Sequence, residues 1–246
     1  MNKFCKLAAA AALAVAGAGA QAAFVIDDFS TSQATVGDHT TGDGGNGFHQ
    51  VCGVGIIGGC RDLYVEKFGS AADDGFAGVR SFVAGGRLSY SQDTGQNGVG
   101  IVRWDGANAA NAIDTAGLGG ADLTAGLVTG IRVEVLSADL AGWPLIFQAW
   151  LDGDGDNNYS MFESTVLGGA GPGIYDFVFA NFTGAVAADF DFSRVGAIQM
   201  IINNGAINDI DLQIDIIQNI PEPGTLALVG ATLLGLGAAR RRAKSA

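Results

Sequence analysis

The densest group of potential metal ligands in the chain is the run Asp152-Gly153-Asp154-Gly155-Asp156. Carboxylates at alternate positions, with glycines that allow a tight bend, suit Ca²⁺, because this ion prefers several oxygen ligands. Glu163 stands at the twelfth position counted from Asp152, but Asn157 stands at the sixth, where EF-hand-type calcium loops require glycine. The run therefore predicts Asp152, Asp154 and Asp156 as calcium ligands, and a solvated hairpin turn is the alternative.

Residues for catalysis are scarce. The two histidines, His39 and His49, lie in a glycine-rich stretch, where we expect them to be exposed to solvent. The sequence has no Gly-x-Ser-x-Gly elbow and no phosphate-cradling loop. Two of the 25 acidic residues could face each other at glycosidase spacing, but so acidic a chain produces such pairs by chance. We assign no catalytic residue and expect a protein that is not an enzyme, with a secreted polysaccharide hydrolase as the alternative.

Sugar binding needs an aromatic face that is open to solvent. Trp150 shares a strand face with Gln148, opposite Phe147, Ala149 and Leu151. This alternation predicts that Trp150 is exposed and binds ligand, and core packing is the alternative.

The charge of the chain limits its partners. Six of the 13 Lys and Arg residues lie near the two ends, so residues 23–239 hold seven basic residues against all 25 acidic ones and carry a net charge of −18. A surface this negative repels nucleic acid phosphates and anionic lipid headgroups. It is compatible with cations such as Ca²⁺ and with neutral sugars, and we expect no nucleic acid partner.

The body of the chain has the pattern of an all-β protein. With 39 glycines and 15% charged residues, it suits strands joined by many tight turns. Short segments in which apolar and polar residues alternate recur at 24–28, 61–67, 87–91, 99–104, 131–135, 145–151, 159–166, 196–202 and 210–216. They predict one jelly-roll-like β-sandwich over residues 23–219. Segment 174–179 is apolar on both faces and is expected to be a central strand, whereas 37–60 is expected to be a long surface loop.

Residues 1–22 have the composition of a secretory signal peptide. Lys3 and Lys6 precede an apolar segment at 7–20, and Ala20-Gln21-Ala22 is a small-x-small cleavage site. We expect the mature chain to begin at Ala23, with cleavage after Ala20 as the next choice. An uncleaved anchor helix is the alternative.

Residues 220–246 have three ordered parts. Pro221-Glu222-Pro223 stays extended, because proline cannot continue a helix. An apolar segment that can enter a bilayer follows at 225–239, and Arg240, Arg241 and Arg242 close it on the cytoplasmic side. Since length alone would also fit a buried helix, this interpretation depends on the order of the parts and on the N-terminal leader.

This order resembles the PEP-CTERM sorting domain of proteins that Gram-negative bacteria export. Pro221, Glu222, Pro223, the apolar segment and the arginines match it, whereas Gly224 stands where many members have Ser. The resemblance implies processing by exosortase, a membrane-embedded protease-transpeptidase, after transient insertion into the inner membrane. It also implies removal of the tail and a host that makes exopolysaccharide. We therefore expect a structural or adhesive protein of the cell surface or biofilm matrix that binds exopolysaccharide or another glycan.

Export also predicts the state of the cysteines. Cys52 and Cys60 are the only two that remain after the leader is removed, and exported proteins mature in an oxidising compartment. Seven residues, four of them glycine, separate the pair and can bend enough to close a small loop. We predict a Cys52–Cys60 disulfide, and the alternatives are free thiols or a metal pair with His49.

The body is also similar, more diffusely, to the galactose-binding-like β-sandwich of many carbohydrate-binding modules. The segments that carry this resemblance are 25–29, 59–65, 104–106, 121–124, 191–193 and 211–217. Such modules often hold a structural Ca²⁺ between the first and last strands. Asp28 and Asp215 are the matching carboxylates here, and two exposed strand acids are the alternative.

Overall fold

The computed structural model describes residues 24–42, 45, 47–69, 78–108, 112–125, 128–152, 161–184 and 191–221. The strands belong to one compact unit, Phe24–Ile220. No helix in these residues is long and apolar enough to cross a membrane. The signal peptide predicted at 1–22 and the membrane segment predicted at 225–239 lie outside them.

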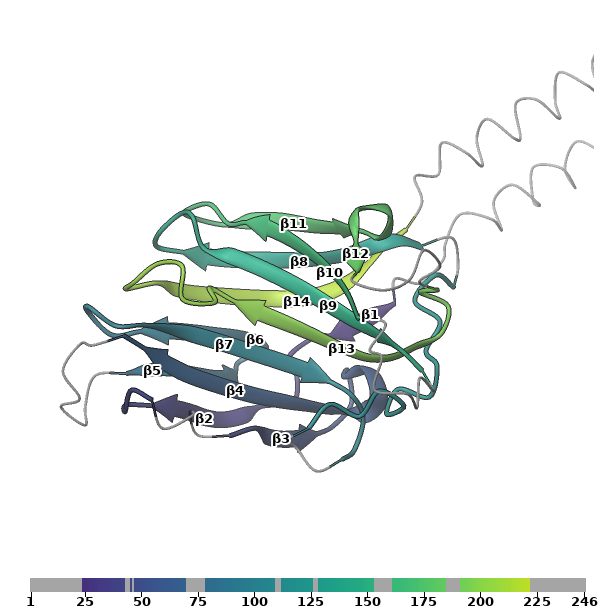
Figure 1. Cartoon of the computed structure of the whole chain (residues 1–246), viewed down its shortest axis with the longest axis horizontal. Helices are drawn as coiled ribbons and strands as arrows, with labels where there is room; N and C mark the ends of the chain where they lie inside the picture. The colour runs from purple at the N-terminus through teal and green to yellow at the C-terminus, as the bar shows by residue number, and fades with distance from the viewer. Residues whose placement is uncertain are drawn as a thin grey trace, which may run out of the picture. The chain divides into compact units, whose positions relative to one another are not determined.

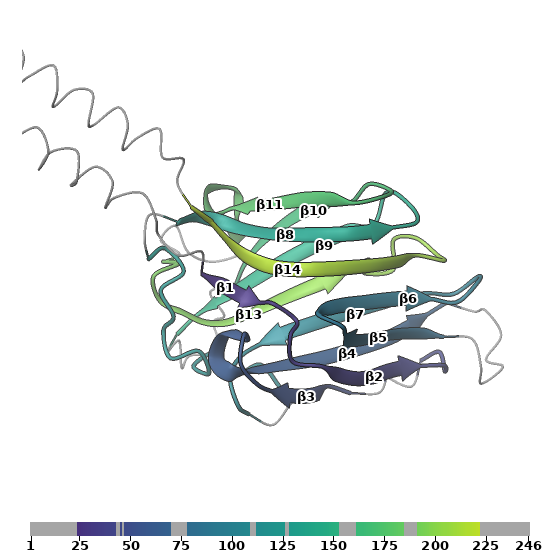
Figure 2. The same ribbon diagram turned by 180° about the vertical axis from the view of Figure 1, so that it is seen from behind.

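Two antiparallel sheets form the predicted β-sandwich (Figure 1, and Figure 2 from behind). Sheet A has the order β11 (Gly173–Val178), β8 (Val128–Ala138), β14 (Asp211–Pro221), β6 (Arg87–Gln92), β5 (Val79–Ala84) and β2 (Gln33–Asp38), and β1 (Val25–Asp27) also pairs with β14. Sheet B has the order β12 (Thr183–Gly184), β10 (Met161–Leu167), β9 (Pro144–Leu151), β13 (Val195–Ile202), β7 (Asn97–Trp104), β4 (Cys60–Phe68) and β3 (His49–Cys52). Two short 3-10 helices, η1 (Ile57–Gly59) and η2 (Phe179–Asn181), complete the described elements.

The core lies between the sheets and follows from the alternation in the strands. In β8, Ile131 and Val133 are buried while Arg132 and Glu134 point outward, because successive side chains of a strand leave opposite faces. Aromatic rings join the two layers. Phe177 of sheet A lies 5.4 Å from Phe147 of sheet B, centroid to centroid.

Two sequence predictions about this fold are wrong. Segment 174–179 was expected to be a central strand, but β11 lies at the edge of sheet A. Its outward side chains do not need cover, since Ile174 is 61% exposed and Asp176 pairs with Arg132 at the surface. Stretch 37–60 was expected to be a loop, but it contains the end of β2, all of β3 and η1. Pairing to β4 makes β3 a strand, although its own residues alternate poorly.

A buried ion pair connects the two sheets. Arg61 Nη1 on β4 lies 2.9 Å from the Asp27 carboxylate on β1, and both side chains are fully buried. Trp104 Nε1 donates a hydrogen bond to the same carboxylate at 2.9 Å, and Arg61 also donates to Gln33 Oε1 at 2.8 Å. Burial raises the pKa of Asp27, while the charge of Arg61 opposes that rise. The pair is therefore well supplied with partners, as buried charges must be.

The Cys52–Cys60 disulfide is confirmed. The two cysteines are cross-strand partners on β3 and β4, with their Cα atoms 4.0 Å apart. The bond fastens the edge strand β3 to sheet B. It closes the glycine-rich turn that contains η1 and that connects β3 to β4.

Replacing both Cys52 and Cys60 by serine is expected to lower the free energy of unfolding by about 2–3 kcal/mol, because the unfolded chain regains the freedom of the closed loop. Urea unfolding of the double variant would measure this loss. Wild type unfolded under reducing conditions should lose the same amount. A double variant as stable as oxidised wild type would contradict the expectation.

Candidate functional site

The predicted calcium ligands are only partly described. Asp154 and Asp156 lie outside the described residues. Asp152 follows β9, where its backbone N–H donates to Arg194 O at 2.8 Å. In the part of the chain that the structure describes, no three His, Cys, Asp or Glu side chains gather closely enough to hold a metal ion. Calcium binding by this run stays a prediction.

The second predicted calcium pair is Asp28 and Asp215. Asp28 is partly exposed, and its carboxylate accepts a hydrogen bond from the backbone N–H of Ser30 at 2.9 Å. The neighbouring residue, Asp27, is the one that turns into the core, and its counter-charge is Arg61. Asp215 lies half-buried on β14. Calcium binding by Asp28 and Asp215 also remains a prediction.

Trp150 lies on the predicted face of its strand, but it is not open to solvent. Phe147 and Ala149 point into the core as expected, and Trp150 lies on the opposite face with only 5% exposure. A chain segment crosses this face at Gly196, where Leu118 N–H donates to Gly196 O at 2.9 Å. The neighbouring Ala197 is the cross-strand partner of Trp150. The predicted exposure is therefore wrong, and ligand binding by this ring stays untested.

The outer face of sheet B carries a row of polar side chains, one from each of six adjacent strands. We name it the polar belt. Each member is the cross-strand partner of the next, in the order Gln50, Asp62, Arg103, Gln199, Gln148 and Glu163. With strands about 4.8 Å apart, the belt extends about 24 Å across the sheet.

Hydrogen bonds hold one end of the belt together. Gln148 Nε2 donates to Glu163 Oε2 at 2.7 Å, and Gln199 Nε2 donates to Gln148 Oε1 at 2.9 Å. Arg103 Nε and Nη2 both donate to Gln199 Oε1, at 3.1 and 3.0 Å. The side chains from β7 to β10 are therefore fixed in one chain of donors and acceptors.

The other end of the belt contains buried polar atoms that lack hydrogen-bond partners. Asp62, Arg103 and the adjacent Asp105 are 1%, 6% and 1% exposed. Both carboxylate oxygens of Asp62, Oδ1 of Asp105 and Nη1 of Arg103 have no hydrogen-bond partner within the described residues. Burial of an unpaired polar group is unfavourable. This end of the belt therefore lowers the stability of the fold unless its buried charges are neutralised.

The pKa of the Asp62 carboxyl group at this end of the belt is unusually high. Burial raises the pKa of Asp62 to about 7, and the negative charge of Asp105 raises it further. The nearby amide dipole of Gln50 and the charge of Arg103 oppose the rise. Gln50 Nε2 itself donates to Gly106 O at 3.2 Å and not to Asp62. Burial also lowers the pKa of Arg103. Asp62 therefore changes its charge near neutral pH, which most carboxyl groups do not.

Apolar and aromatic groups flank the belt. The guanidinium carbon of Arg103 lies 3.8 Å from the ring centroid of Phe48, and Phe48 stacks on Tyr64 at 4.9 Å. A parallel row follows the same strands, formed in cross-strand order by Tyr64, Ile101, Ile201, Ile146 and Thr165. The rings and the isoleucines are half-buried. Sheet B thus presents a polar row beside an apolar one.

Sequence reasoning missed the belt. The signal that was present is a polar residue at the outward position of an apolar strand, such as Arg103 between Val102 and Trp104 or Gln199 between Ile198 and Met200. One such residue on a strand is unremarkable, and only the pairing register puts six of them in a row.

Comparison with known proteins concerns first the C-terminus. Residues 219–242 match the family described as the PEP-CTERM protein-sorting motif. This chain carries a PEP-CTERM sorting motif. The motif indicates export through the inner membrane of a Gram-negative bacterium. β14 ends at Pro221, the first proline of the motif, while Glu222 and Pro223 lie outside the described residues.

The sandwich that precedes the PEP-CTERM motif is similar to solved carbohydrate-binding modules. One is the family 11 module from Clostridium thermocellum in complex with a β-1,3-1,4-mixed-linked tetrasaccharide, with 10% identity, a TM-score of 0.39, and coverage of 78% of this chain and 97% of that one. The family 30 module of a Clostridium thermocellum cellulase has 11% identity, a TM-score of 0.39, and coverage of 77% and 98%. No curated protein matches the chain.

Proposed function

We propose that this chain is an exosortase-processed protein of the cell surface or extracellular matrix, with a structural or adhesive role in exopolysaccharide. The sorting motif at 219–242 is the observation that supports export and processing. The net charge of −18 between residues 23 and 239 favours neutral partners over nucleic acid or anionic lipid. Positioned outside the cell, the sandwich acts by contact rather than by catalysis.

The outer face of sheet B supports the glycan part of this proposal. A sugar carries hydroxyl groups that donate and accept hydrogen bonds, together with apolar C–H faces. The half-buried side chains of Gln50, Gln148 and Glu163 supply donors and acceptors. The half-buried rings of Phe48 and Tyr64 supply an apolar wall. A row about 24 Å long suits an extended chain of sugars better than a single ring.

Processing is tested by Glu222→Ala in the full chain. We expect the variant to keep its tail and to accumulate in the inner membrane, because the sorting protease no longer recognises the motif. Cell fractionation with mass determination of the protein would detect this. Glu134→Ala, on the outer face of sheet A, is the control and should be processed normally. Normal processing of the Glu222 variant would count against the export route.

Glycan binding is tested by affinity electrophoresis of the exported protein in gels that contain the host's own exopolysaccharide. We expect retardation, and about tenfold weaker binding for Tyr64→Ala or Gln148→Ala. Ile174→Ala is the control, since this side chain is exposed at the edge of sheet A. Equal retardation of all variants would exclude the polar belt as the binding face.

A polysaccharide hydrolase is the second candidate, because one observation favours it. Asp62, with a pKa raised to about 7, lies beside the second carboxyl group of Asp105, and such pairs serve acid–base catalysis. Against this, both side chains are 1% exposed. The test is release of reducing sugar from the exopolysaccharide. Release by wild type that is abolished in Asp62→Asn would support the hydrolase and overturn the proposed binding role.

A further inference from the structure

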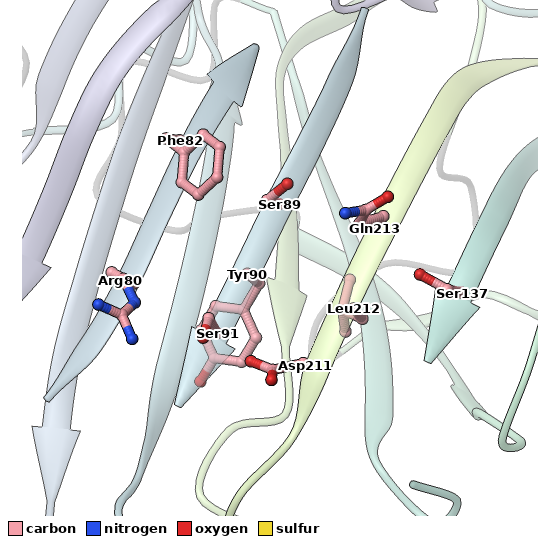
Figure 3. Close-up of a pocket in the computed structure, with 9 residues that line it drawn as sticks. All are labelled: Arg80, Phe82, Ser89, Tyr90, Ser91, Ser137, Asp211, Leu212 and Gln213. Carbon is pink, nitrogen blue, oxygen red and sulfur yellow. The ribbon is translucent and has the colours of Figure 1, made fainter. Parts of the chain in front are cut away.

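The outer face of sheet A, opposite to the polar belt, has a hollow of about 280 Å³. Figure 3 shows its lining side chains on β5, β6, β14 and β8. They form two cross-strand rows, one of Arg80, Ser91 and Asp211 and one of Phe82, Ser89 and Gln213, with Ser137 at the side. Because Tyr90 and Leu212 between these positions are buried, the rows point away from the core.

Free hydrogen-bonding groups line this hollow. The hydroxyls of Ser89, Ser91 and Ser137 and the carboxylate of Asp211 make no hydrogen bond to the described residues. Gln213 Oε1 accepts from Arg87 Nη1 at 3.4 Å, which leaves the amide nitrogen of Gln213 available. The hollow therefore offers donors and acceptors side by side, as a ligand with several hydroxyl groups requires.

The remaining lining decides the class of ligand. The half-buried ring of Phe82 gives an apolar floor beside the serines, and aromatic rings accept the C–H face of a sugar. Arg80 is paired with Asp93, so its charge is compensated. The Asp139 carboxylate accepts a hydrogen bond from Asp211 N–H at 2.8 Å. These two acids outweigh the single charge of Arg87, which bonds Gln213, and the hollow is negative. An anionic ligand is disfavoured by this charge. A neutral saccharide fits both the polar and the apolar groups.

We propose that this hollow is a second saccharide site and that the protein cross-links neutral polysaccharide chains. The inference rests on the proposed glycan binding by sheet B. Because the two sheets of a sandwich pack about 10 Å apart around one core, sites on their outer faces point in opposite directions. Each molecule then holds one chain on each side, and the matrix gains a bridge.

The test uses the exported protein and three neutral polysaccharides, a β-glucan, a galactan and a mannan. Light scattering follows cross-linking, and affinity electrophoresis follows binding. With the polysaccharide that retards wild type most, we expect wild type to increase the scattering of the solution. Phe82→Ala and Gln213→Ala should still be retarded but should raise scattering at least about tenfold less. Two hollow variants are needed because one of them could unfold, which thermal melting would reveal, and Ile174→Ala is the matched control.

The outcomes separate the two proposals. Hollow variants that bind but no longer cross-link support the second site. Folded hollow variants that cross-link as wild type overturn it while glycan binding by sheet B stands. Binding without cross-linking by wild type also overturns the second site alone. Wild type that binds none of the three polysaccharides and not the host's exopolysaccharide overturns both. Retention of a peptide instead of a saccharide by the hollow, lost in Phe82→Ala, overturns the ligand class.

Discussion

Arg61→Met is expected to lower the free energy of unfolding by about 3–5 kcal/mol, because it leaves the Asp27 carboxylate buried without its counter-charge. Both side chains of the pair are fully buried, and Arg61 also loses its bonds to Gln33 Oε1 and to Thr31 O. Methionine keeps much of the volume, so the loss reports the charge and the hydrogen bonds more than a cavity. Urea unfolding at pH 7 would measure it.

The same variant should acquire a pH dependence of known sign. Arg61 opposes the rise in the pKa of Asp27, so its removal moves that pKa further above the value of the unfolded chain. A carboxyl group with a raised folded-state pKa stabilises the fold when protonated, and this stability is lost as pH rises through the folded pKa. Arg61→Met should therefore recover part of its stability in acid.

Arg132→Met provides the matched control for this ion pair. Arg132 lies 2.7 Å from Asp176, but both side chains are about one third exposed. Exposed pairs of this kind contribute about 0–1 kcal/mol. An Arg61 variant that loses no more stability than the Arg132 variant would show that the buried pair is not what connects β1 to β4.

The sequence predicted the fold class because alternation is a local property of a strand. Segments 131–135, 145–151 and 196–202 all lie in observed strands. The same property misplaced β11, because an edge strand such as this one can carry an apolar outward residue, Ile174, without cover. It also missed β3, whose pairing to β4 is fixed by a partner and a disulfide rather than by its own residues.

The candidate site was less predictable, for a physical reason. The sorting motif is contiguous, so its residues could be read in order. The polar belt and the hollow come from strands that are far apart in the chain, such as β4 with β7 or β6 with β14, and only the register makes their residues neighbours. A shift of one residue would turn Arg103 or Gln199 to the other face. Acidic runs such as Asp152–Asp156 attract attention because they are local.

Asp62→Asn is expected to stabilise the protein at pH 8 and to have little effect near pH 4. With its pKa raised to about 7 by burial and by Asp105, Asp62 is protonated in the folded state at pH values where the unfolded chain is already ionised. Stability therefore falls as pH rises from about 4 to about 7. An amide at this position cannot ionise and should recover on the order of 1–2 kcal/mol of stability at pH 8. Chemical unfolding at several pH values would measure the difference between the two proteins.

The neighbours of Asp62 make this prediction specific. Arg103 opposes the raised pKa, so Arg103→Met should extend the fall in stability to higher pH and enlarge the total loss between pH 4 and pH 8. Asp62→Asn combined with Arg103→Met should remove this added loss. Asp176→Asn, at an exposed ion pair, is the control and should leave the pH profile nearly unchanged.

If Asp62→Asn follows the wild-type profile at every pH, the raised pKa is wrong and the hydrolase interpretation loses its acid. If the slope disappears, the belt contains a carboxyl group that turns negative near neutral pH.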